Sequence, residues 1–218
     1  MRYTLTHTED FVSTFGLSCG ALVDRYNIAP TQDAPILIAE GDDVVCVSAR
    51  WGLIPAWKKN AESGEWLANA RSETLAEKPA FRDLVQRSRC IIPASGFYEW
   101  KKERGVSYPF YITLPSRPLF GFAGLCDWWS DPASGELKPT FTMVTCPSNV
   151  LVARIHDRMP VILPERDEAG WLSGPYVPDV LQPYPETGMA MVQVVQTVND
   201  PRHEGAECIS EAGKSSWW

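Results

Sequence analysis

The segment IHDRMPVIL, residues 155–163, holds His156, one of only three histidines in the chain. A histidine gains and loses its proton near neutral pH, so this side chain is suited to general acid or base chemistry. Asp157 and Arg158 follow it directly and can orient or tune the ring. The alternative is a turn histidine before a buried strand, and the motif alone leaves both interpretations open.

A second candidate is Glu99, in the aromatic motif SGFYEWKK. If the motif is a strand, Glu99 shares a face with Phe97, while Tyr98 and Trp100 point the other way. An aromatic wall excludes water from a carboxylate and raises its pKa towards the range that is useful for proton transfer. The alternative is a solvent-facing glutamate on an edge strand, paired with Lys101.

The motif NARSET, residues 69–74, combines an amide, a guanidinium and two hydroxyls just before a predicted helix. One interpretation is helix capping, in which Asn69 or Ser72 accepts hydrogen bonds from free backbone amides. The other is chemical, with Asn69 orienting a reacting group and Arg71 binding an anion. The two roles are compatible.

Two further motifs, RYNIAPTQ and RWGLIPAWKK, interleave cations with aromatic side chains. The cations are Arg25, Arg50, Lys58 and Lys59, and the aromatic residues beside them are Tyr26, Trp51 and Trp57. Such a pattern suits single-stranded nucleic acid, in which bases stack on rings and the backbone needs positive partners. A tryptophan core rimmed by solvated charges has the same pattern and remains the alternative.

Several other kinds of site are excluded by the motifs. The chain has no P-loop, no GxGxxG, no HExxH and no GxSxG sequence. Its histidines, His7, His156 and His203, lie far apart without the spacing of metal ligands. We therefore expect no metal and no cofactor.

Composition sets broader limits on compartment and partners. The chain has 218 residues and a net charge of −7, which leaves room only for a local basic strip. No apolar stretch is long enough to span a membrane, and no leader precedes the first motif. The six cysteines are scattered without a CxxC pair, so we expect mostly buried free thiols. The predicted compartment is the cytoplasm, with no membrane contact.

These residues must be positioned by short β-rich runs that turn residues separate. The predicted strands lie within residues 34–39, 43–54, 89–102, 108–114, 119–129, 140–146, 159–163 and 189–195. Four helices are predicted, in THTEDFVSTFGL, SETLAEKPAFRDLVQRS, CPSNVLVARI and PERDEAGWL. The pattern favours an α+β fold in one domain, 1–218, with a surface loop at 173–188 and a weakly ordered tail at 211–218.

Taken in order, five motifs closely resemble the SOS response-associated peptidase (SRAP) family, which processes abasic sites in DNA. They are RYNIAPTQ, RWGLIPAW, NARSET, RCIIPASGFYEWKK and IHDRMPVIL. The resemblance runs from Arg2 to about residue 163, and more weakly to VVQTVND near residue 200. It implies a strongly bent mixed β-sheet or small β-barrel core surrounded by helices.

The resemblance also implies a mechanism. In that family the initiator Met is removed from a Met-Cys-Gly-Arg start, which exposes an N-terminal cysteine. Its α-amine attacks the ring-opened aldehyde of an abasic site to give a Schiff base, and the thiol then closes a stable thiazolidine. The product is a covalent protein–DNA crosslink, so the implied partner is single-stranded DNA that contains abasic sites. When such a protein is bound to DNA, we expect it to be associated with the nucleoid.

The family's functional residues carry over to the matching motifs. The catalytic positions fall on Asn69, Glu99 and His156. The phosphate-binding arginines fall on Arg2, Arg71 and Arg158. Beside them, we expect Trp51 and Trp100 to support neighbouring bases or the wall of the site.

The start of the chain departs from the family pattern, because it reads MRYTLTH and lacks the Cys-Gly pair between Met1 and Arg2. No thiazolidine can form at this terminus as written. Missing first residues, a protein made without its nucleophile and a natural variant are the open explanations. The remaining α-amine can still form a reversible Schiff base, which promotes β-elimination and strand cleavage. Two rivals stay open: a non-catalytic module for single-stranded or modified DNA, and a thiol peptidase.

Overall fold

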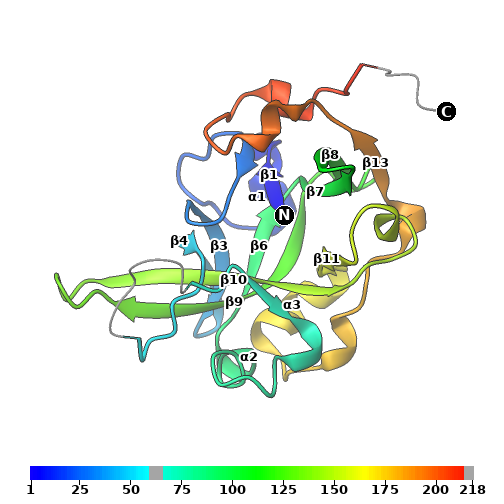
Figure 1. The fold of residues 1–218 in the computed structure, drawn as a ribbon. Coiled ribbons are helices and arrows are strands. Elements are labelled where there is room, and N and C mark those ends of the chain that lie inside the picture. The colour runs from blue at the N-terminus through cyan, green and yellow to red at the C-terminus, as the bar shows by residue number, and fades with distance from the viewer. Residues whose placement is uncertain (59–65, 214–218) are drawn as a thin grey trace.

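The centre of the molecule is a closed barrel of five strands, seen in the computed structural model, which describes residues 1–58 and 66–213 (Figure 1). The strands follow the order β10-β4-β3-β6-β9, and β9 pairs with β10 to close the ring. Their bounds are Asp33–Glu40 (β3), Asp43–Trp51 (β4), Arg89–Ala94 (β6), Phe120–Ser130 (β9) and Leu137–Pro147 (β10). Because β4 and β10 run parallel while the other pairs are antiparallel, the sheet is mixed, as predicted.

A second sheet of five strands, in the order β13-β8-β7-β1-β2, packs beside the barrel. Its strands are Arg2–Leu5 (β1), Arg25–Ile28 (β2), Gly96–Glu103 (β7), Val106–Thr113 (β8) and Ala190–Gln193 (β13). The chain passes from β6 to β7 through Ser95, whose hydroxyl lies 2.8 Å from that of Thr4 and accepts from the backbone N–H of Thr6. The predicted run RCIIPASGFYEWKK is therefore two strands that belong to different sheets.

The remaining elements are short. They are strands Asn69–Arg71 (β5), Arg158–Pro160 (β11) and Ile162–Leu163 (β12), and helices Phe11–Phe15 (α1), Leu84–Arg87 (α2) and Glu165–Ser173 (α3). Turns of 3-10 helix lie at Thr8–Asp10, Ser72–Thr74, Val152–Arg154, Pro178–Val180, Glu186–Gly188, Gln196–Asn199 and Ala206–Ile209. The α+β class is confirmed, and the predicted loop at 173–188 carries only two such turns beyond the end of α3.

Two predicted helices are much shorter than expected. In SETLAEKPAFRDLVQRS only the 3-10 turn and the four residues of α2 are helical, and Pro79, which has no backbone N–H to donate, separates them. In CPSNVLVARI, β10 continues through Pro147, and only Val152–Arg154 turns. Asn149 holds that turn, because its side-chain oxygen accepts from the N–H of Val152 at 2.9 Å.

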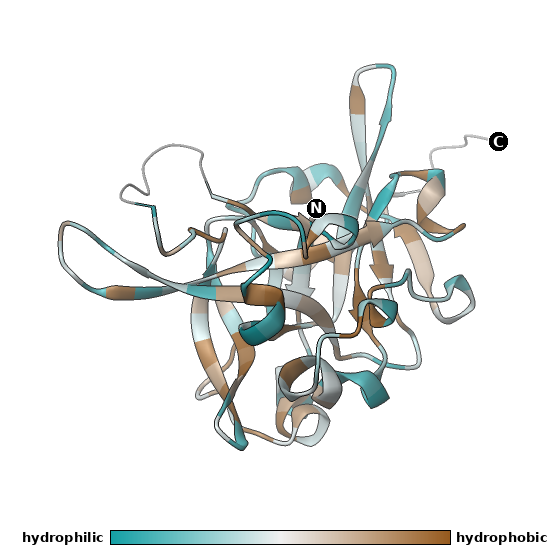
Figure 2. Ribbon diagram, turned by 90° about the horizontal axis from the view of Figure 1, so that it is seen from below, coloured by the Kyte–Doolittle hydropathy of each residue, from teal (hydrophilic) through white to brown (hydrophobic). Residues whose placement is uncertain are grey.

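One hydrophobic cluster is shared by the barrel and the second sheet. Tyr3 of β1 packs edge-on against Trp51 of β4 and Phe122 of β9, with ring centroids 5.3 and 6.0 Å apart. The strands carry most of the apolar residues, while loops and hairpin tips are mainly hydrophilic (Figure 2). The common core fixes β1 against the barrel, so the chain start has a defined place.

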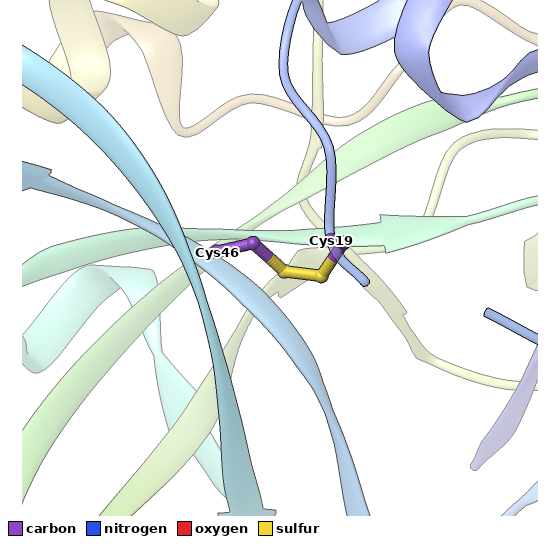
Figure 3. Close-up of a disulfide and its surroundings, with 2 residues drawn as sticks. All are labelled: Cys19 and Cys46. Atoms are coloured by element: carbon purple, nitrogen blue, oxygen red, sulfur yellow. A yellow bond between two sulfur atoms is a disulfide. The ribbon is translucent and has the colours of Figure 1, made fainter. Parts of the chain in front are cut away.

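Most of the cysteines follow the expectation of free thiols. Cys90, Cys126, Cys146 and Cys208 are buried free thiols, as predicted. Cys19 and Cys46 instead form a disulfide that ties the segment before β2 to strand β4 (Figure 3). The expectation of mostly free thiols is confirmed, and this pair, which was not predicted, forms because the fold brings Cα atoms 27 residues apart in sequence within 5.3 Å, a normal separation for a disulfide.

Within the described residues, no helix is long and apolar enough to cross a membrane. Of the predicted tail at 211–218, residues 214–218 lie outside the described part of the chain. The same holds for Lys59 of the RWGLIPAWKK motif.

Candidate active site at the start of β1

Pairing between β1 and β7 brings the α-amine to Glu99. The antiparallel register matches Arg2 with Tyr98 and Tyr3 with Phe97, so Met1 falls opposite Glu99. The amine nitrogen lies 3.8 Å from Oε2 of Glu99, and the side chains of both residues are almost fully buried. An amine and a carboxyl thus face each other where little water can enter.

His156 completes this group from another part of the chain. Its Nε2 lies 4.0 Å from Oε2 of Glu99, the same oxygen that faces the amine. Its Nδ1 accepts from the backbone N–H of Arg158 at 3.0 Å and lies 3.4 Å from Oδ1 of Asp157. The carbonyl oxygen of Arg158 also lies 3.0 Å from Nδ1, so either tautomer of the ring has a partner there, and Nε2 is the ring nitrogen that faces Glu99.

The environment of Glu99 matches its predicted burial. The residue is only 2% exposed, and Phe97 on the same face is fully buried. The solvent-facing alternative is wrong, because Lys101 pairs with Glu103 at 3.1 Å. Burial raises the pKa of Glu99, and the nearby amine and His156 offset part of that rise. The carboxyl is therefore able to hold a proton at a higher pH than an exposed glutamate.

Asn69 and Arg71 lie on β5, which runs parallel to β10. Both side chains are exposed, and neither forms a hydrogen bond or ion pair with any part of the chain that the structure describes. The capping interpretation is wrong, since the turn that starts at Ser72 has no side-chain cap. The structure does not join this motif to Glu99 or His156 by a direct contact, and it leaves the Arg71 guanidinium open to an anion.

Arg158 is half-buried and already held by other protein groups. Its guanidinium forms a two-pronged ion pair with Glu73 and donates to the carbonyl oxygen of Thr145 at 2.6 Å. This pairing lowers the pKa of Glu73 to about 2. Glu73 is a residue that the sequence interpretation missed, although it lies within NARSET and is an acid two positions after Arg71.

Arg2 and Trp100 lie together on the second sheet, with the guanidinium 5.3 Å from the ring centroid. Arg2 donates to the carbonyl oxygens of Val198 and Asn199, the latter at 2.7 Å. The indole N–H of Trp100 donates to the side-chain oxygen of Asn199 at 2.6 Å. Both predicted DNA contacts therefore hold the C-terminal segment against β1.

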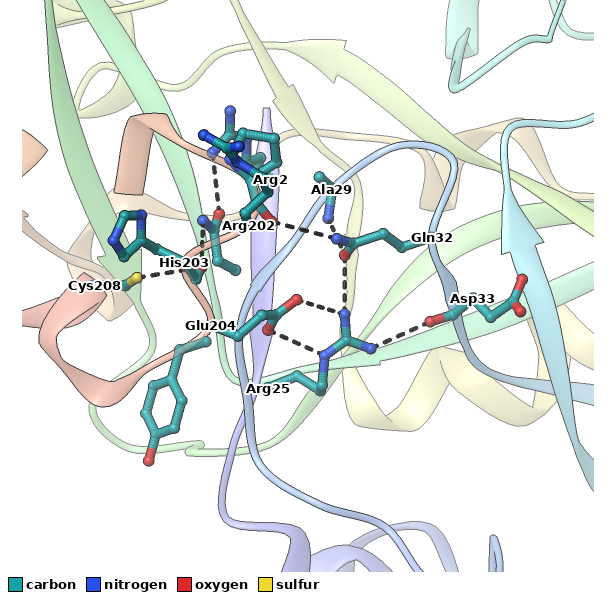
Figure 4. Close-up of polar contacts among 12 residues, drawn as sticks. Arg2, Arg25, Ala29, Gln32, Asp33, Arg202, His203, Glu204 and Cys208 are labelled. Atoms are coloured by element: carbon teal, nitrogen blue, oxygen red, sulfur yellow. Dashed lines mark hydrogen bonds and ion pairs between the residues drawn. The ribbon is translucent and has the colours of Figure 1, made fainter. Parts of the chain in front are cut away.

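Neighbouring residues of β2 hold the same C-terminal segment. The side-chain amide of Asn27 donates to the carbonyl oxygens of Val198, Asp200 and His203. Arg25 forms an ion pair with Glu204 at 2.6 Å and also donates to Gln32, as Figure 4 shows. The motif RYNIAPTQ, read above as a nucleic-acid pattern, anchors the end of the chain with its Arg25 and Asn27.

The prediction that Trp51 supports DNA bases is wrong, because this residue is fully buried and offers no ring face to DNA. Its neighbours are Tyr3 and Phe141, and its indole N–H donates to the carbonyl oxygen of Ala68 at 2.8 Å. Ala68 directly precedes Asn69. The tryptophan therefore supports the candidate site from beneath, through the backbone that leads into β5.

Known proteins resemble this chain along most of its length. The abasic site processing protein YoqW of Bacillus subtilis is 40% identical over 95% of this chain and 97% of its own. The abasic site processing protein HMCES of Xenopus tropicalis is 32% identical over 85% of this chain and 65% of its own.

Solved structures match the fold as well. A protein of Bordetella bronchiseptica has a TM-score of 0.77 at 28% identity, covering 89% of this chain and 99% of its own. A protein of Bacteroides thetaiotaomicron has a TM-score of 0.75 at 31% identity, covering 84% and 82%. The model of the SOS response associated peptidase (SRAP) family matches residues 1–201. The chain belongs to the SRAP family.

Proposed function

We propose that this protein processes abasic sites in DNA through an imine formed by its N-terminal α-amine, with Glu99 and His156 moving the protons. One observation carries the proposal: Oε2 of Glu99 lies within 4.0 Å of both the amine and the imidazole. The names of the relatives YoqW and HMCES support abasic DNA as the substrate.

The proposed first step forms a bond between the amine nitrogen and C1′ of the ring-opened sugar, which is an aldehyde. The nitrogen loses a proton to Glu99, and the former carbonyl oxygen takes one from solvent, giving a carbinolamine. A second proton, from His156 or from protonated Glu99, lets that hydroxyl leave as water and gives the protonated imine. A carboxyl whose pKa burial has raised suits this step, because it holds a transferred proton more readily than an exposed glutamate and can then return it.

The fate of the imine depends on the first residue. After a Cys-Gly start, the cysteine thiol adds to the imine carbon and closes a thiazolidine. After Met1 there is no thiol at this position. The imine then acidifies the C2′ proton; loss of that proton to a base breaks the C3′–O bond, and the strand is cleaved. Removal of an initiator Met before cysteine would use the same pair, with Glu99 activating water.

Single-stranded DNA is the proposed form of the substrate. Arg71 offers an exposed guanidinium on β5, and its planar fork suits a phosphate. Arg2 and Arg158 are bound to protein groups in this structure, so a phosphate would have to share or replace those partners. Arg71 is therefore the first phosphate contact that we propose.

The test compares this chain with a version in which Met-Cys-Gly replaces Met1. Each is incubated with abasic or intact single-stranded oligonucleotides, with and without borohydride. We expect a heat-stable adduct on abasic DNA for the Cys-Gly version, and for the Met1 chain a reversible adduct that borohydride traps. No trapped adduct with either protein would refute the imine. Equal, salt-sensitive binding to both oligonucleotides without any adduct would favour a non-catalytic module.

The structure does not favour a thiol peptidase that acts on other proteins. Such an enzyme needs an accessible thiolate. The four free cysteines are buried, and burial raises the pKa of Cys146 to about 12 and that of Cys208 above its usual range. Within the described residues, Glu99 and His156 are joined to an amine rather than to a thiol.

A further inference from the structure

A groove of about 510 Å³ runs along one face of the second sheet. Tyr108 and Phe110 of β8 line its floor, and Met191 of β13 and Ile155 close one side. These aromatic and apolar side chains are half-buried, so each still has an accessible surface. The volume lies in the range of about 300–1,000 Å³ that small-molecule sites occupy.

The groove is positively charged within an acidic protein. Lys101, Arg104 and Arg154 line it, and Glu103, its one lining acid, is paired with Lys101 at 3.1 Å. Arg104 and Arg154 are exposed and form no ion pair with any described residue. Since the whole chain carries a net charge of −7, this cluster is a local site for an anion.

The groove is lined by residues next to those of the candidate active site. Phe110 is the cross-strand partner of Glu99, and Tyr108 is the partner of Lys101. Directly opposed residues of an antiparallel pair point to the same face, so the aromatic floor begins beside the Glu99 carboxyl. Arg154 and Ile155 immediately precede His156 in sequence. A strand whose abasic sugar lies at Glu99 therefore has its next nucleotide over this groove.

We propose that the groove binds the nucleotide adjacent to the abasic residue, with its base on Tyr108 and Phe110 and its phosphate at Arg154. This inference rests on the proposed function for its choice of ligand. Base–aromatic stacking tolerates any base, because every base has a π-face. The groove therefore binds the neighbouring nucleotide whichever base it carries. The groove has room for a single nucleotide, on one side of the abasic residue.

The test measures equilibrium binding of oligonucleotides that carry a tetrahydrofuran abasic analogue, which has no aldehyde and cannot form an imine. One oligonucleotide has neighbours only on the 5′ side, and another only on the 3′ side. For one of the two, we expect Tyr108→Leu to weaken binding on the order of fivefold. For the same oligonucleotide, Arg154→Gln should make the plot of log binding constant against log salt concentration less steep by about 0.7, because one phosphate contact is lost.

Lys102→Gln is the matched control, because Lys102 is exposed and lies on the opposite face of β7 from Lys101. It removes the same charge and should leave binding of both oligonucleotides unchanged. Circular dichroism melting establishes that each variant is folded. Wild-type affinity of Tyr108→Leu and Arg154→Gln for both oligonucleotides would overturn the proposal, as would an equal loss on both or no binding by the wild type.

The two proposals can fail separately. If binding of the analogue responds as expected while borohydride traps no adduct on true abasic DNA, the groove stands and the imine falls. If adducts form but the groove variants bind and react like the wild type, the imine stands and the groove falls.

Discussion

Oε2 of Glu99 faces Nε2 of His156 at 4.0 Å, although the two residues are 57 positions apart in sequence and lie on different segments. The same oxygen is 3.8 Å from the α-amine. We expect Glu99→Gln to slow adduct formation about a hundredfold or more, since a carboxamide cannot relay the proton. Single-turnover borohydride trapping measures this rate. Glu40→Gln, the same change at an exposed residue at the end of β3, serves as the control; a wild-type rate for Glu99→Gln would exclude the proposed role.

The same carboxyl should leave a signature in stability. Burial raises the folded-state pKa of Glu99 above its ordinary value of 4.5, so the folded state holds this proton more tightly than the unfolded chain. Its contribution is fully present below pH 4.5 and is lost as the pH rises through the folded-state pKa. Glu99→Gln stays neutral throughout, so its unfolding free energy should fall less than that of the wild type between about pH 4 and about pH 8. Urea denaturation at both pH values measures the unfolding free energy of each protein. An equal decrease with rising pH in the wild type and in Glu99→Gln would contradict the prediction.

Trp51 should matter for folding and not for contact with DNA. Trp51→Phe removes the indole N–H that Ala68 accepts at 2.8 Å and leaves a buried carbonyl without its partner. We expect a loss of about 1–3 kcal/mol in unfolding free energy, with further loss from the space that the smaller ring leaves. Affinity of the folded variant for single-stranded DNA should stay within twofold of the wild type, by fluorescence anisotropy. A large loss of affinity in a fully folded variant would restore Trp51 as a contact.

The disulfide between Cys19 and Cys46 should stabilise the fold when it is formed. It closes a loop across a sequence separation of 27, for which loop entropy gives about 3–4 kcal/mol. Reductant should therefore lower the melting temperature of the wild type. The Cys19→Ser/Cys46→Ser double variant should melt at the reduced protein's temperature and ignore the reductant. Equal melting of the wild type with and without reductant would show that the bond contributes nothing.

Local features of this fold could be predicted from the sequence. Alternation in SGFYEWKK placed Phe97 and Glu99 on one face, and the structure indeed separates Phe97 from Tyr98 into different hydrophobic clusters. The strand RYTL at the chain start was not predicted, because four residues are too few to show a period.

The missed features depend on tertiary structure. A buried tryptophan such as Trp51 and an exposed one such as Trp57 have the same local signature in RWGLIPAW, and only the fold separates them. Cys19 and Cys46 have no characteristic spacing that would pair them. The carbonyl partner of Arg2 lies 196 residues away, beyond any local pattern. Long-range pairing of this kind follows from packing, so the family resemblance that assigned Arg2 to DNA phosphates could not indicate these partners.

That distance also sets the order in which the protein can become ordered during its synthesis. Arg2 is made early, while the carbonyls of Val198 and Asn199, which hold it, are added 196 and 197 residues later. At about 5–20 residues per second, roughly 10–40 s separate the two events. During that interval β1 can pair with β2 and β7, but Arg2 lacks the carbonyl partners that it has in the complete fold. We expect Arg2 of a nascent chain to stay without these two hydrogen bonds until residues 198 and 199 have been made.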